Sequence, residues 1–78
     1  MSTKKHSIYL NAKELMHSEA KRLKLQSDDK PYIRYELNNL FDQMSRQFYY
    51  YAMKDTISTK QAAMYHKWLE NYTCKMHP

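Results

Sequence analysis

The 78-residue sequence contains no glycine, one cysteine and two prolines. Without glycine, tight turns that require a positive φ are costly, which disfavours a β fold rich in hairpins. Cys74 has no second cysteine to pair with, and a lone thiol without a leader segment indicates a reducing, cytoplasmic setting. No apolar run approaches the ~20 residues needed to span a bilayer, so no membrane partner is expected. The composition predicts an all-α or nearly all-α fold.

The charge of the chain is uneven. The whole sequence has a net charge of +5, from 13 basic and 8 acidic residues. Residues 1–25 alone carry six lysine or arginine residues against two glutamates. Such a basic N-terminal third suggests a polyanion as partner, although a merely solvated surface is the alternative interpretation. We expect one domain over residues 1–78, in which residues 1–5 form a flexible basic arm.

The longest helical pattern runs from Pro31 to Lys54, and we predict a helix over about residues 29–54. The 24 residues from Pro31 to Lys54 would make a rod of roughly 36 Å. Ser27 or Asp28 is expected to cap this helix, and Asp28 and Asp29 stand where acidic residues complement a helix dipole. Because so short a chain cannot easily cover so long a helix, we expect a second copy to pack on it in a homodimer. The apolar face comprises Ile33, Leu37, Leu40, Phe41, Met44, Phe48, Tyr51 and Ala52.

The segment before this helix is predicted to begin with a short strand. Residues 6–10 alternate in polarity with a period of two, which is typical of a strand. Asn11 then resembles a helix N-cap, and Glu14 is spaced to complete a capping box. The sequence therefore predicts a helix over about residues 12–24. Its inward face is expected to consist of Leu15, Met16, Ala20 and Leu23.

A third helix is predicted over about residues 59–75. Ser58 and Gln61 have the spacing of a capping box. The connector that precedes Ser58 is short, so this helix should turn back antiparallel onto the central one. Its apolar seam is spaced 3, 4, 3 and 4 residues apart and comprises Ala62, Tyr65, Leu69, Tyr72 and Met76.

The order of basic strand, capped helix, short turn and second helix resembles the ribbon-helix-helix family of repressors. The resemblance rests on residues 5–44, above all on the segment from Lys5 to Asn11. It implies that two chains pair their strands into a ribbon that enters the major groove of DNA. Lys5, Ser7 and Tyr9 would then read bases. Phosphate contacts would come from Lys4, Lys5, Lys13, Lys21, Arg22 and Lys24.

A second hypothesis assigns the function to protein binding. Tyr49, Tyr50 and Tyr51 are consecutive, and neighbouring helical positions point about 100° apart, so a small core cannot bury all three. Tyrosine is enriched at protein interfaces, although partial burial under the third helix is the alternative. The protein would then be a phage- or plasmid-type inhibitor of a host protein. Its surface would comprise Phe48, Tyr49, Tyr50, Tyr51, Met53, Met64 and Trp68.

Nothing in the sequence indicates an enzyme. Cys74 and His77 have half of the spacing of a zinc site, but no second pair completes it. Asp28 and Asp29 could imitate a catalytic carboxylate pair, although acids at a helix start are more often caps. No phosphate-binding loop, nucleophile elbow or metalloprotease motif is present. We therefore expect no catalytic residue, no metal and no cofactor.

Overall fold

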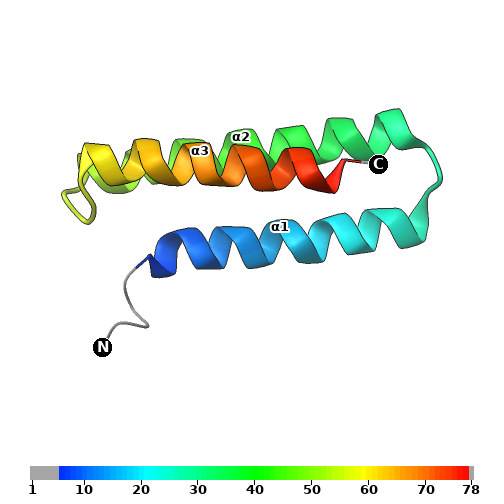
Figure 1. Ribbon diagram of the computed structural model, residues 1–78, viewed down its shortest axis with the longest axis horizontal. Coiled ribbons are helices and arrows are strands. Elements are labelled where there is room, and N and C mark those ends of the chain that lie inside the picture. The colour runs from blue at the N-terminus through cyan, green and yellow to red at the C-terminus, as the bar shows by residue number, and fades with distance from the viewer. Residues whose placement is uncertain (1–5, 78) are drawn as a thin grey trace.

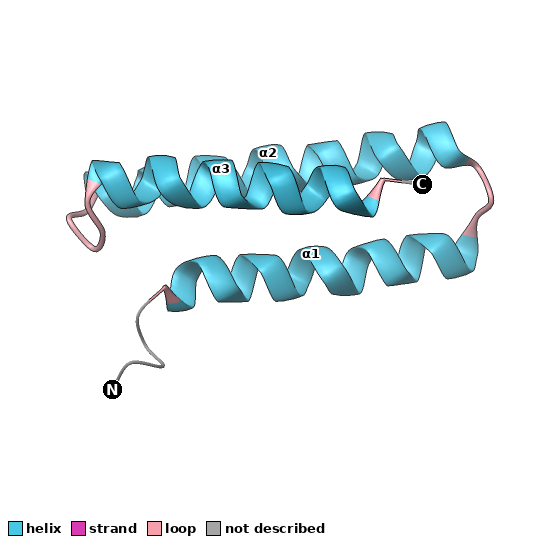
Figure 2. Cartoon of the chain, in the orientation of Figure 1, coloured by secondary structure: helices cyan, strands magenta, loops and turns pink. Residues whose placement is uncertain are grey.

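A computed structural model of the protein describes residues 6–77, and in this range the chain forms three α-helices, each antiparallel to the one before it (Figure 1). They are α1 (Ser7–Gln26), α2 (Lys30–Met53) and α3 (Thr59–Met76). Figure 1 shows α1 running alongside the pair formed by α2 and α3. Figure 2 shows helices and connecting loops, and no strand, over the same residues. The all-α architecture agrees with the expectation from composition, and the long central helix agrees with the expectation from the apolar periodicity.

The predicted N-terminal strand is wrong. Residues 7–10 are the first turn of α1, and the Leu10 amide donates to the His6 carbonyl at 2.9 Å. Tyr9 is held by two rings of α3, stacked on Tyr65 with centroids 5.8 Å apart and edge-on to Trp68 at 5.2 Å. A five-residue alternation is too short to outweigh these contacts. The ribbon implied by the family resemblance therefore has no strand within residues 6–77.

The predicted cap at Asn11 is wrong for the same reason. Asn11 lies inside α1 with an exposed side chain, so it cannot accept from the first amides of that helix. Instead His6 occupies the N-cap position, with a left-handed φ of 64°. No side chain of the described residues caps α1 there. The helix starts at Ser7 because packing of its first two turns replaces local capping.

The other two helices begin within one residue of their predicted starts, although the cap of α2 is Asp29 rather than the predicted Ser27 or Asp28. The Asp29 carboxylate caps α2 by accepting from the Tyr32 amide at 3.2 Å. At α3 both bonds of the predicted capping box are present: the Gln61 amide donates to Ser58 Oγ at 3.0 Å, and the Ser58 amide donates to Gln61 Oε1 at 2.9 Å. The turn between α2 and α3 places Asp55 at a φ of 60°, a conformation that aspartate tolerates better than most residues.

The core lies along the axis shared by the three helices. The predicted faces of α2 and α3 are confirmed, since their members are buried or pack against the core, except that Tyr51 is only partly buried and lines a groove beside α1. One residue of α1 was placed wrongly: the Leu15 side chain is 50% exposed rather than inward. Since α1 extends back to Ser7, its apolar face also includes Ile8, Tyr9 and Ala12, and Leu15 falls at its edge. The buried core comprises Met16, Ala20, Leu23, Ile33, Leu37, Met44, Phe48, Ala62, Tyr65 and Leu69.

The structure contains one chain, so the homodimer stays a prediction. Within residues 6–77, no helix combines the length and the apolar character needed to cross a membrane.

Candidate polyanion-binding face

Basic side chains form a stripe along one flank of α1. Lys13, His17, Lys21 and Lys24 follow one another at intervals of four, four and three residues, which places them on one face of the helix. At about 1.5 Å per residue, the stripe is roughly 16 Å long. This flank faces α3, so the side chains of α3 decide what surrounds the stripe.

Two aromatic residues of α3 support the N-terminal half of the stripe. The Lys13 ammonium nitrogen lies 5.0 Å from the centroid of the Tyr72 ring, within the range of a cation–π contact. The Tyr72 hydroxyl lies 3.2 Å from Nδ1 of His17, at hydrogen-bond distance. One turn earlier, Tyr9 meets Trp68 edge-on. These contacts hold the α1 and α3 sides of the face in register.

The C-terminal half of the stripe borders a groove between α1 and α3. The groove has a volume of about 400 Å³. Three lysines and a histidine surround an apolar floor, and none of the described side chains that line it carries a carboxylate. Lysine ammonium groups bind phosphate as flexible point charges. The lining residues are His17, Ala20, Lys21, Lys24, Leu25, Lys75 and Met76.

Arg22 lies on the other flank of α1 and does not join this face. Its Nε donates to both carboxylate oxygens of Glu19 at 3.2 Å. Hydrogen bonding from Arg22 lowers the pKa of Glu19, so the pair stays charged and compensated. An arginine that is already neutralised contributes little to anion binding.

The remaining predicted DNA contacts are dispersed. Lys4 and Lys5 lie outside the described residues. Ser7 is exposed at the start of α1. Tyr9 packs on α3, and burial raises the pKa of its hydroxyl, followed by a smaller effect of Tyr72. The described part of the DNA-binding set is therefore reduced to Lys13, Lys21 and Lys24 on one face.

The predicted protein interface does not form one surface. Phe48 is a core residue at 1% exposure, and Met64 is partly buried against the core. Trp68 belongs to the α1–α3 side, where it contacts His6, Tyr9 and Tyr65. Tyr51 is partly buried and faces α1. Tyr49, Tyr50 and Met53 remain exposed together at the end of α2.

Two residues of the basic groove, His17 and Lys75, were missing from the sequence-based site. His17 could have been found, because it stands four residues from both Lys13 and Lys21. Lys75 could be added only after the packing of α3 against α1 was known.

The described chain offers no metal site. Across residues 6–77, no group of three or more histidine, cysteine, aspartate or glutamate residues could hold an ion. Cys74 is exposed, and Nε2 of His77 lies 3.0 Å from the Asn38 side-chain oxygen. Burial, with a smaller effect of Arg34, lowers the pKa of His77.

Comparisons with known proteins give no identity: no family model, no curated protein and no solved structure matches the chain.

Proposed function

We propose that the protein binds DNA by holding its phosphate backbone against the basic face between α1 and α3. The observation that carries this proposal is the convergence of Lys21, Lys24 and Lys75 around one groove without a carboxylate in its lining. Three like charges held close together repel one another, and an anionic ligand relieves that repulsion. A DNA backbone supplies such charges at a regular spacing.

The apolar floor of the groove also fits this function. Ala20 and Met76 give the groove an apolar floor between the lysines, and apolar surroundings strengthen the attraction of an ammonium group for phosphate. Lys13 extends the same face by two helical turns beyond Lys21. The resulting contacts are to the backbone, so we expect weak dependence on base sequence.

The test is an anisotropy titration of labelled duplex DNA with the intact protein and two triple variants. The variant Lys21→Ala, Lys24→Ala, Lys75→Ala should bind at least about tenfold more weakly at low salt. The control Arg46→Ala, Lys54→Ala, Lys60→Ala removes the same charge from outside the groove and should bind nearly as well as the intact protein. If both variants lost the same DNA affinity, the loss would depend on net charge alone, and the assignment of binding to this face would be refuted.

A second candidate function is capture of another protein by the end of α2. The observation that favours it is the joint exposure of Tyr50 at 53% and Met53 at 79%, beside the exposed Tyr49. Replacing Tyr49 and Tyr50 with serine should abolish partner capture in a pull-down and leave the helical content unchanged. The triple lysine variant should spare capture, which separates this candidate from DNA binding.

A further inference from the structure

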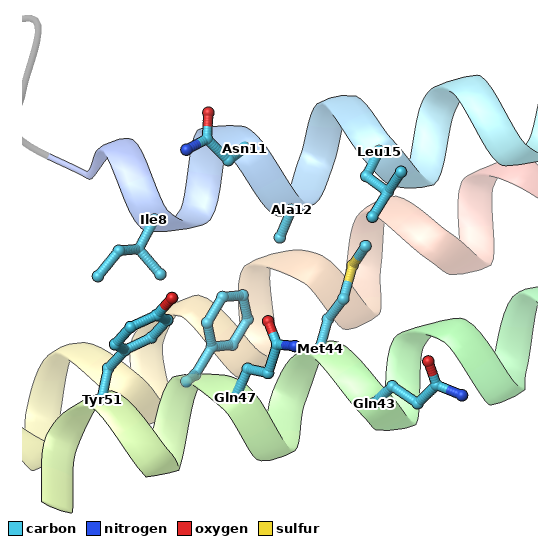
Figure 3. A pocket seen from close by; sticks show the side chains of 9 residues that line it. Ile8, Asn11, Ala12, Leu15, Gln43, Met44, Gln47 and Tyr51 are labelled. Atoms are coloured by element: carbon cyan, nitrogen blue, oxygen red, sulfur yellow. The ribbon is translucent and has the colours of Figure 1, made fainter. Parts of the chain in front are cut away.

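A second groove lies between α1 and α2, on the other flank of α1 from the basic face. Its volume is about 190 Å³, and its floor includes Met44 and Phe48 from α2. Figure 3 shows Ile8, Ala12 and Leu15 of α1 pointing toward α2 across this groove, while Met44 and Tyr51 of α2 reach toward α1. Lys21 and Lys24 of α1 line the other groove instead, on the flank of the helix that faces α3.

The groove is electrically neutral. None of its nine lining side chains, all within the described part of the chain, carries a charge. Its polar rim is made of three amides, Asn11, Gln43 and Gln47, each of them exposed. On a protein with a net charge of +5, this face is one that another positively charged molecule can approach closely.

We propose that this neutral groove binds the same groove of a second copy of the chain in a two-fold dimer. In a two-fold interface each residue near the axis meets its own counterpart, so like charges would repel. An amide both donates and accepts hydrogen bonds and can therefore pair with its own copy. Gln43 and Gln47 can therefore lie close to a two-fold axis, whereas the lysines of the opposite flank would repel their counterparts there.

The groove also contains a protruding residue and a hollow side by side. Leu15 is 50% exposed at the groove edge, and the short side chain of Ala12 lies about one turn before it in the lining of the hollow. Two copies related by a two-fold axis can each insert Leu15 into the hollow of the other. Burial of two leucines and the groove floor supplies the apolar contact that such a small interface needs. Dimerisation leaves the face between α1 and α3 open, and it does not depend on DNA binding.

Sedimentation equilibrium of the full chain tests this dimer. We expect the intact protein to reach twice the 9.5 kDa mass of one chain as its concentration rises. Leu15→Lys should weaken the association about a hundredfold. Leu10 provides a matched control, because it lies on the same helix, is 48% exposed and does not line the groove. Leu10→Lys should leave the dimer intact.

A pair of charge variants keeps the test independent of any folding defect in Leu15→Lys. Gln47→Lys and Gln47→Glu should each impair self-association, because each places like charges across the axis. An equimolar mixture of the two should recover the dimer as a heterodimer. A purely monomeric intact protein at submillimolar concentration would overturn the proposal. So would equal effects of the Leu10 and Leu15 substitutions, or a mixture of Gln47 variants that stays monomeric.

Discussion

Replacing Tyr9 with alanine should loosen the first two turns of α1 from the bundle. Tyr9 is partly buried, stacks on Tyr65 and meets Trp68 edge-on. Each aromatic pair contributes about 0.5–1.5 kcal/mol beyond the area that it buries. With about 1 kcal/mol more for the burial itself, the total loss is about 2–4 kcal/mol. Alanine is a strong helix former, so the loss reports packing rather than helix propensity.

Urea denaturation monitored by circular dichroism gives the overall loss of unfolding free energy. Hydrogen exchange shows where it occurs, because the Leu10 amide bonds to the His6 carbonyl and exchanges only when this turn opens. The Leu10 amide should exchange much faster in Tyr9→Ala, whereas amides in the middle of α2 and α3 should change less.

Leu10→Ala is the control, because Leu10 is next in sequence and its side chain is about half exposed. It should lower the unfolding free energy by less than about 1 kcal/mol. A loss below about 0.5 kcal/mol in Tyr9→Ala, or equal losses in the two variants, would refute the role given to the aromatic contacts.

Three further predictions concern capping, burial and pH. Ser58→Ala should lower the unfolding free energy by about 1 kcal/mol, because it removes the hydroxyl that accepts from the Gln61 amide; an unchanged urea midpoint would contradict the capping box. Among the described residues nothing hydrogen-bonds the buried Nδ1 of His66. His66→Phe should therefore raise the unfolding free energy by up to about 1 kcal/mol, and a clear loss would contradict this. The pKa of His77 is lowered below its usual value of 6.5 in the folded chain, so the folded chain favours the neutral imidazole. The contribution of His77 to the unfolding free energy is therefore complete above pH 6.5 and is lost as the pH falls through the folded pKa. Thermal melts from pH 7 to pH 5 should show this decline, and His77→Gln should reduce it.

Two helices could be predicted from sequence because their signals are local. The period of α2 extends over many turns, and the start of α3 follows from the Ser58–Gln61 capping box. Both patterns lie within a few residues of the structure that they specify.

The start of α1 could not be predicted because its determinants are distant. Residues 6–10 alternate in a way that suits a strand, and the rings that hold Tyr9 in a helix belong to Tyr65 and Trp68, more than fifty positions away. The same limit applies to the candidate site. The stripe from Lys13 to Lys24 is visible in the sequence, but the addition of Lys75 requires the contact between α1 and α3.

The dependence of DNA affinity on salt concentration tests the proposed function most directly. For duplex DNA the slope of log K against log salt falls by about 0.9 for each phosphate contact. We predict a clearly negative slope for the intact protein, and a slope shallower by about 2.7 for the variant that lacks the ammonium groups of Lys21, Lys24 and Lys75. A slope near zero for the intact protein, or an identical slope for the variant, would contradict phosphate binding at the basic groove.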